Sequence, residues 1–500
     1  MNYQELLNFL APEALTTLAA LGILFNDVTM LRGESHGTRM RWAAWLTVFA
    51  GGVGILAVLL SPQSTPVGYA GGMVEITALT QFIKVVLLAL AAATALISAE
   101  FRFTDHIGEY FALLLLATVG TMFMVSAGNL LLIFVSLELL SLSLYVMTAF
   151  NKTNVRSAEA ALKYFLFGGI SAAFLLFGLS LLYGLTGELE VRRMAAKLAT
   201  MKMDPLLMVG ILGVFVGLGF KVAAVPFHLW APDTYQGAPL PSAAFIASAS
   251  KVASFYVLAR LMMTGFIGSE GSGGGKGFEA GWVPVLAVSA ALSVVAGNLA
   301  AIAQGSVRRL LAYSAVAHAG YMLIGILAAQ KAEGMASVIY YVVTYGVTAI
   351  GAFAVVGIVQ AQGGDDRIAS FAGLSRRSPV LAVCLMVFLL SMAGIPPLAG
   401  FFGKFYLFKA ALFETGPSQS NGLLWLVVLA IAMSAVSLYY YLQVLKQVFV
   451  AAPPDGEPKI QPKPGTLWVI VLGGVLVVVL GCLPNLLVSH LVDAVHAAGF

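Results

Sequence analysis

Apolar stretches of about 20 residues recur along the whole chain, separated by short polar segments. A helix of that length crosses about 30 Å of hydrocarbon, and a backbone in lipid must satisfy its own hydrogen bonds. The pattern therefore predicts an all-α polytopic membrane protein with about 14 transmembrane helices. The predicted spans lie near residues 10–30, 42–62, 76–98, 108–127, 129–150, 162–186, 205–225, 242–264, 283–304, 308–330, 336–361, 379–414, 423–447 and 466–488.

Two of these stretches are interrupted by residues that break helices. The span at 379–414 is too long for one straight helix and contains Gly394, Pro396 and Pro397. The span at 205–225 is followed by a proline-rich strip, 226–241, which predicts a broken half-helix or a re-entrant turn. Transporters place such breaks at their ion sites.

Composition excludes several classes of protein. The chain is 60% hydrophobic and 10% charged, whereas soluble domains carry about 25% charged residues. There is no C-x-x-C pair, no G-x-G-x-x-G motif and no basic run with interleaved aromatic residues. We therefore expect no redox cofactor, metal or nucleic acid to bind this chain, so that any redox group would belong to another chain.

The distribution of basic loop residues predicts the orientation. Most loop lysines and arginines fall on one side, among them Arg32, Arg39, Arg41, Arg102 and Lys463, which places that side in the cytoplasm and both termini in the periplasm. The loop with Arg192 and Arg193 departs from this rule.

Several ionisable residues fall inside the spans, where a central charge costs roughly 2.5–3.5 kcal/mol. Some have structural explanations. Arg260 and Lys409 lie near span ends, where a long side chain can reach the interface, and Lys163 opens its span. Lys84 shares its span with Glu75 and is expected to pair with it.

Four residues near span centres lack such an explanation: Glu138, Lys221, Lys251 and Lys404. Lys221 and Lys404 each lie beside a broken, glycine-flanked helix, where exposed backbone implies protein or water nearby. The alternative is a set of static buried ion pairs. The spacing from Glu138 to Lys221 nearly equals that from His318 to Lys404, a weak sign of an inverted repeat.

Three segments resemble the antiporter-like subunits of respiratory complex I, in detail closest to subunit N. They are Phe220 to Pro239 (FKVAAVPFHLWAPDTYQGAP), Arg309 to His318 (RLLAYSAVAH) and Gly394 to Lys404 (GIPPLAGFFGK). The sequence Ala161 to Phe165 (ALKYF) adds to the likeness, which covers roughly residues 105–450.

The resemblance implies two inverted five-helix units, each with a broken helix. It implies four segments: helices 1–3 in 1–104, the first unit in 105–265, the second in 283–450, and helix 14 in 451–500. By position it makes Glu138, Lys221, Lys251, His318 and Lys404 a proton relay, with His228 and Lys163 as secondary positions. The chain would then be a subunit of a proton-translocating NADH–quinone oxidoreductase in the bacterial inner membrane.

The implied mechanism is a relay in which Glu138 controls Lys221, which exchanges protons with Lys251 and, through His318, with Lys404. Two unit charges 4 Å apart interact by about 4 kcal/mol at an effective dielectric constant near 20, about three orders of magnitude in proton affinity. Partner subunits would supply FMN, iron–sulfur clusters and quinone.

Three alternatives stay open. They are a subunit of an Mrp-type cation/proton antiporter, the matching subunit of a plastoquinone complex or membrane hydrogenase, and a structural scaffold with static buried ion pairs.

Overall fold

The computed structural model describes residues 9–61, 67–69, 71–271, 279–328, 332–363, 365–413, 422–453 and 459–499. These residues form a helical bundle with one short β-hairpin, which confirms the predicted all-α membrane architecture. The helices of the first half are α2 (Ala11–Val28), α3 (His36–Leu60), α4 (Ala78–Ser98), α5 (Ile107–Ser126), α6 (Leu130–Thr148), α7 (Val155–Thr186), α8 (Val191–Leu198), α9 (Pro205–Val222), α10 (Trp230–Gly237), α11 (Leu240–Ala247), α12 (Ala249–Arg260) and η1 (Leu261–Gly265). Those of the second half are α13 (Trp282–Ile302), α14 (Val307–Ala328), α15 (Ala332–Gly363), η2 (Ile368–Phe371), α16 (Leu374–Arg377), α17 (Pro379–Ala393), α18 (Ala399–Phe413), α19 (Leu424–Phe449), α20 (Pro464–Cys482) and α21 (Asn485–Ala497).

Twelve helices among the described residues are long and apolar enough to cross a membrane, counting α11, α12 and η1 as one. The other two predicted spans have helices but miss those limits. One is α2, in which Glu13, Asn26 and Asp27 lower the apolar character. The other is 379–414, which is divided into α17 and α18, each 15 residues long. The number of crossings therefore remains a prediction.

Polar residues at the helix starts fix where several spans begin. Asn129 accepts a hydrogen bond from the backbone N–H of Leu132 at 2.7 Å, and Asp204 accepts one from Leu207 at 2.8 Å. Thr77 and Thr80 form a reciprocal capping box at the start of α4. Each cap satisfies a backbone donor that the helix cannot, which matters most where the helix leaves water for lipid.

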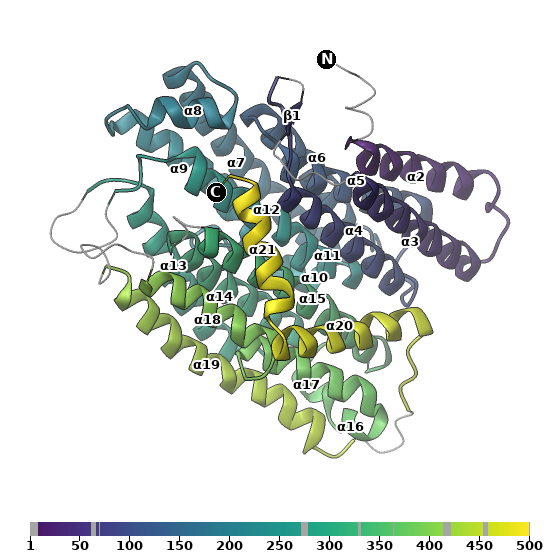
Figure 1. The fold of residues 1–500 in the computed structure, drawn as a ribbon. Coiled ribbons are helices and arrows are strands. Elements are labelled where there is room, and N and C mark those ends of the chain that lie inside the picture. The colour runs from purple at the N-terminus through teal and green to yellow at the C-terminus, as the bar shows by residue number, and fades with distance from the viewer. Residues whose placement is uncertain are drawn as a thin grey trace.

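The helices form layers around a buried centre (Figure 1). In the span of α11, α12 and η1, every residue of an 18-residue apolar stretch is buried, and in α14 and α15 94% of such a stretch is buried. By contrast, only 28% of an apolar stretch of the same length in α20 is buried. The N-terminal helices α2 and α3 pack side by side at one edge, and α21, which was not predicted from the sequence, packs across α4 and α15. The central helices are therefore shielded from lipid by the chain itself.

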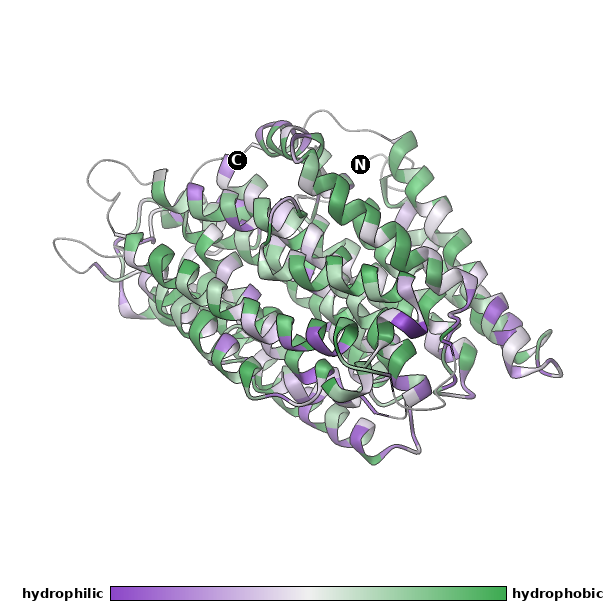
Figure 2. Cartoon of the chain, turned by 90° about the horizontal axis from the view of Figure 1, so that it is seen from below, coloured by the Kyte–Doolittle hydropathy of each residue, from purple (hydrophilic) through white to green (hydrophobic). Residues whose placement is uncertain are grey.

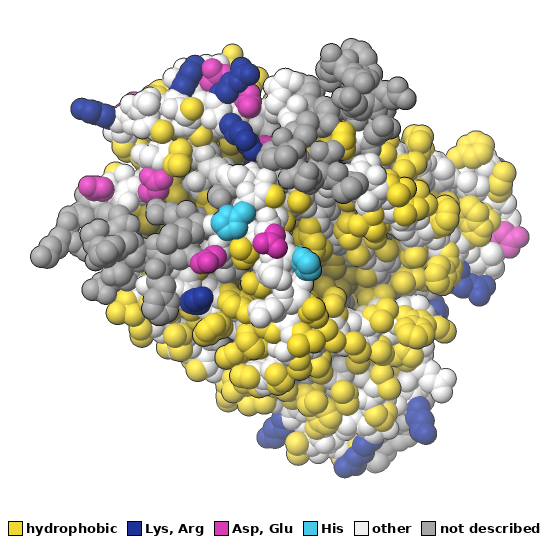
Figure 3. All heavy atoms as spheres, in the orientation of Figure 1, with side chains coloured by type: hydrophobic (Ala, Val, Ile, Leu, Met, Phe, Trp, Pro, Cys, Tyr) yellow, Lys and Arg dark blue, Asp and Glu magenta, His cyan; other side chains and the backbone are white. Residues whose placement is uncertain are grey.

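The two ends of the bundle carry the polar connections. Figure 2 shows largely hydrophobic helices, with hydrophilic residues toward their ends and a few inside the bundle. On the face in view in Figure 3, hydrophobic side chains form a broad area, and Lys and Arg gather over α8 and near α16. At the α8 end, the hairpin of β1 (Val67–Tyr69) and β2 (Val74–Ile76) joins the start of α6 through a hydrogen bond from Gly128 N–H to Met73 O of 2.7 Å.

The expected pairing of Lys84 with Glu75 was wrong. Lys84 Nζ lies 2.6 Å from Glu13 Oε1 of α2, with both side chains almost fully buried. Arg260 is also buried, and it binds Glu75 and the carbonyl oxygen of Ala127. Glu75 also binds Arg192, so one carboxylate holds two arginines at the α8 end.

Candidate functional site

Both predicted helix breaks exist, and they share one local structure. At the end of α9, Ala223 has a left-handed backbone (φ 60°), and the Ala224 N–H donates to Gly219 O at 2.9 Å. At the end of α17, Gly394 is left-handed (φ 87°), and the Ile395 N–H donates to Leu390 O at 3.1 Å. Both are Schellman motifs, followed by a proline that cannot continue the helix.

The strip after the first break is a half-helix, α10, as one of the two readings of the sequence predicted. The recurrence of the motif agrees with an internal repeat. However, Lys221 lies before its left-handed residue and Lys404 lies after its own, so the two lysines are on opposite sides of their breaks.

Lys221 occupies the last turn of α9 in an aromatic pocket. Its Nζ lies 5.3 Å from the centre of the Tyr145 ring and 5.4 Å from that of Tyr164. It has no hydrogen-bond partner among the described residues, and the side chain is 2% exposed. Glu138 of α6 is half-buried and interacts electrostatically with Lys221, but the two form no direct ion pair.

Close helix packing makes room for this pocket. A Cβ on Gly168 of α7 would lie 1.8 Å from the Tyr145 hydroxyl oxygen, so only glycine fits there. Gly178 and Gly213 allow α7 and α9 to approach at their crossing, since a Cβ on Gly213 would lie 2.8 Å from the carbonyl oxygen of Phe174.

Lys251 and His318 lie in the buried centre. Lys251 Nζ of α12 donates to the carbonyl oxygen of Ala315 on α14 at 2.8 Å and lies 5.7 Å from the Tyr345 ring centre. His318 Nδ1 is 2.6 Å from the hydroxyl of Tyr341, and its ring centre is 4.9 Å from that of Tyr345. Tyr345 thus lies beside both Lys251 and His318. Tyr321 connects His318 to Lys404 in the same way, with its ring centre 5.8 Å from that of His318 and 4.9 Å from Lys404 Nζ.

Lys404 follows the second break and reaches back to it. Its Nζ donates to the carbonyl oxygens of Met392 at 2.9 Å and Ala393 at 3.0 Å, and to Ser434 Oγ at 2.8 Å. These carbonyls end α17, where the helix leaves them without helical partners. A small cavity of about 10 Å³, roughly enough for one water molecule, is lined by His318, Ser391, Met392 and Gly400, among others.

Lys163 and His228, the two secondary positions, make no contact with the buried lysines or His318 that the structure records. Lys163 Nζ forms ion pairs with Glu159 at 2.6 Å and Asp233 at 2.7 Å, and Asp233 also binds Arg309 at 2.6 Å. This triad links α7 to α14 through α10. His228 lies in the turn before α10, half-buried, and its Nδ1 has no partner among the described residues.

The tyrosines near Lys221 and Lys251 were not predicted from the sequence. Tyr164 stacks on Trp230 with ring centres 4.4 Å apart, and Trp230 contacts Tyr235 at 6.2 Å. Tyr235 also contacts Phe353 of α15, with ring centres 5.6 Å apart. A run of apolar-dominated helix gives no sign of which aromatic ring faces a lysine, so only the aromatic richness near Lys221 could have drawn attention to them.

Buried polar atoms without a hydrogen-bond partner among the described residues concentrate at the first break. They include Glu138 Oε1, Tyr164 Oη, Lys221 Nζ, His228 Nδ1, Thr234 Oγ1 and Tyr235 Oη. Buried polar groups are rarely left unpaired and are commonly satisfied by ordered water. No group of three or more His, Cys, Asp or Glu in the described part of the chain is placed to hold a metal ion.

Comparison with known proteins agrees with this arrangement. Residues 127–434 match the family described as NADH:quinone oxidoreductase/Mrp antiporter, TM. NADH-quinone oxidoreductase subunit N 2 of Acidobacterium capsulatum is 50% identical, covering 98% of this chain and 99% of its own length. The subunit N of Moorella thermoacetica is 37% identical, covering 98% of both chains.

Solved structures show the same fold. A chain of respiratory complex I from Thermus thermophilus with bound aureothin superposes with a TM-score of 0.78 at 33% identity, covering 96% of this chain and 99% of its own. A chain of the Mrp complex from Dietzia has a TM-score of 0.80 at 20% identity, covering 97% of both, which shows a shared fold. The chain therefore belongs to the subunit N family of NADH–quinone oxidoreductase, within the wider family of antiporter-like membrane subunits.

Proposed function

We propose that this chain conducts protons across the membrane as a subunit of a bacterial NADH–quinone oxidoreductase. The path runs along Glu138, Lys221, Lys251, His318 and Lys404. Partner membrane subunits surround the chain in the complex, and the redox chemistry that drives transport takes place on FMN, iron–sulfur clusters and quinone in other subunits. Family membership supports the assignment to a complex with other membrane subunits.

One observation carries the proposal. Lys221, Lys251 and Lys404 are each at most 5% exposed, and among the described residues none forms an ion pair with a carboxylate. When a lysine held by carbonyl dipoles, aromatic faces and nearby charges gives up its proton, it loses less stabilising free energy than a lysine that is paired with a carboxylate. Such residues can exchange protons with water or with each other.

Tyrosines extend the path from Lys221 toward Lys251. Tyr164 faces Lys221 and, like Tyr235, contacts Trp230, and Tyr345 lies beside Lys251 and His318. Hydroxyls donate and accept hydrogen bonds, so each could pass a proton with a bridging water. The unsatisfied Tyr164 and Tyr235 hydroxyls support such waters.

The alternatives are less well supported. A static scaffold requires ion pairs, and the structure has them elsewhere, at Glu13–Lys84 and Arg260–Glu75, where opposite charges touch. The lysines of the proposed path are held differently. The full-length relatives are named as NADH-quinone oxidoreductase subunits, which favours that complex over an Mrp-type antiporter.

Lys404→Met tests the proposal against a matched control on the same helix. Lys404 is buried at the second break, whereas Lys409 is exposed. In inverted membrane vesicles oxidising NADH, Lys404→Met should sharply lower proton uptake per NADH at normal complex content, whereas Lys409→Met should leave it unchanged. Equal uptake in the two variants would refute a path through Lys404.

A further inference from the structure

A groove open to the surface runs between the ends of α3, α4 and α20. Its volume is about 670 Å³. Its walls are mainly apolar, with Met40, Ala44 and Trp45 from α3 and Leu96 from α4. We call it the α3–α20 groove. Charged residues border one end, among them Arg41, Arg102 and Lys463, so the groove joins an apolar channel to a basic rim.

The position of the groove fits a membrane interface, because its basic rim is at the ends of three helices that are otherwise apolar. Trp45 is 61% exposed beside this rim. Tryptophan is enriched where headgroups meet hydrocarbon. At the right of the view in Figure 3, basic side chains border the hydrophobic surface.

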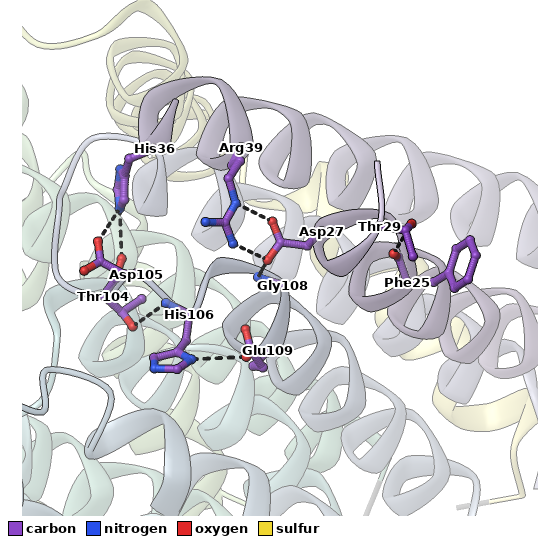
Figure 4. Close-up of polar contacts among 10 residues, drawn as sticks. All are labelled: Phe25, Asp27, Thr29, His36, Arg39, Thr104, Asp105, His106, Gly108 and Glu109. Atoms are coloured by element: carbon purple, nitrogen blue, oxygen red, sulfur yellow. Dashed lines mark hydrogen bonds and ion pairs between the residues drawn. The ribbon is translucent and has the colours of Figure 1, made fainter. Parts of the chain in front are cut away.

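The contacts near the rim show which cations are free to bind a ligand. Figure 4 shows that the neighbouring Arg39 is held by Asp27, with nitrogen–oxygen distances of 2.8 and 2.6 Å. His36 Nε2 is likewise engaged, 2.8 Å from the carbonyl oxygen of Thr104. Asp27 also accepts the Gly108 N–H at 2.9 Å, so this cluster fixes α2, α3 and α5 behind the groove.

Arg41 and Arg102 are bound much more weakly. Arg41 is exposed, and its Nε donates to a carbonyl oxygen of its own helix, Gly37, at 3.2 Å. Arg102 approaches Asp105 at 3.5 Å, with both side chains more than 70% exposed. Glu100, the carboxylate of the lining, accepts the backbone N–H of Lys463. The rim therefore presents two available guanidinium groups, which suit phosphate oxygens.

We propose that the α3–α20 groove binds a diacyl anionic phospholipid. Its phosphate lies between Arg41 and Arg102, and its acyl chains follow Met40, Ala44, Trp45 and Leu96. Basic pockets between transmembrane helices select anionic headgroups in this way. Two other surface grooves, of about 520 Å³ between α17 and α20 and about 450 Å³ beside α9 and α13, have no basic residue in their lining. Those should accept acyl chains without headgroup preference.

Photolabelling of the assembled complex in its membrane tests the proposal. The probes are phosphatidylglycerol and phosphatidylcholine, each with a diazirine in one acyl chain, and labelled peptides are located by mass spectrometry. We expect phosphatidylglycerol to label residues 40–45 and 96 in preference to phosphatidylcholine. In Arg41→Gln/Arg102→Gln the preference should fall about fivefold for each charge removed.

Two further variants make the result interpretable. Arg32→Gln removes an exposed arginine at the same end that does not line the groove, so labelling should stay at the wild-type level. Arg41→Lys/Arg102→Lys keeps both charges and should retain the preference. Equal labelling by both probes in the wild type, or cross-links showing that a helix of a neighbouring subunit fills the groove, would overturn the proposal.

Discussion

At the scale of single residues, buried charges fall into two groups that the sequence could not separate. Lys84 and Lys221 both lie in apolar helices, yet Lys84 touches Glu13 and Lys221 touches aromatic rings. The position along each span singled out Glu138, Lys221, Lys251 and Lys404, and in the structure the three lysines are buried. The sequence does not give the rotation of each helix, so Lys84 was paired with the wrong carboxylate.

The tyrosine path makes a prediction at this scale. Tyr235→Phe removes one buried hydroxyl and leaves the ring packing, so proton uptake per NADH should fall while the complex still assembles. Tyr340→Phe is the control, because the Tyr340 hydroxyl lies on α15 but donates to the carbonyl oxygen of Leu480 on α20, away from the path. Uptake in inverted vesicles is the measurement. A Tyr235→Phe complex that transports like Tyr340→Phe would show that this hydroxyl carries no proton.

At the scale of elements, prolines and glycines allowed both breaks to be predicted from the sequence. The form of the first break could not be predicted. Ala223 has a left-handed backbone, which alanine disfavours, so nothing in the sequence marks this residue as the end of the helix. The short helix α21 was missed because its 13 residues are too few for a span and its buried face rests on α4 and α15. Tertiary contact, more than local sequence, defines such an element.

Gly394→Ala tests the second break. Gly394 is left-handed, and a Cβ there would lie 3.1 Å from Lys404 Cδ, so the variant should lose about 1–2 kcal/mol of stability and displace Lys404. Proton uptake should fall with it. Gly184→Ala in α7 meets no atom within 4 Å and should be neutral or stabilise by about 0.5–1 kcal/mol. Thermal unfolding of the purified complex measures both. Equal stability and uptake in the two variants would mean that the geometry of this break is dispensable.

At the scale of the whole molecule, the buried centre explains how an apolar chain can hold ionisable groups. Helices shielded from lipid on all sides can carry such groups, and Lys251 and His318 of the proposed path lie in α12 and α14, whereas Glu138, Lys221 and Lys404 lie in α6, α9 and α18. Outer helices such as α3 and α20 are apolar and exposed, as the sequence pattern required. The arrangement of these layers depends on packing between distant segments, which periodicity along one chain does not encode.

The orientation is also a prediction at this scale. The ends of α3, α4 and α20 carry Arg41, Arg102 and Lys463, so this side should face the cytoplasm and both termini the periplasm. Alkaline phosphatase fused to the C-terminus should be active, and a green fluorescent protein fusion dark. If instead the green fluorescent protein fusion were fluorescent and the phosphatase fusion inactive, the topology would be reversed, and with it the direction of the proposed path.

Replacing Lys221 by arginine tests the central claim most directly. Arginine keeps the positive charge but remains protonated, so it can serve as a structural charge but not as a proton carrier. Proton uptake per NADH oxidised is measured in inverted vesicles at matched complex content, with Lys221→Met beside it. We predict that both variants assemble and that both lose most of their proton uptake. Normal uptake in Lys221→Arg, with loss in Lys221→Met, would contradict proton exchange at Lys221 and make it a fixed charge.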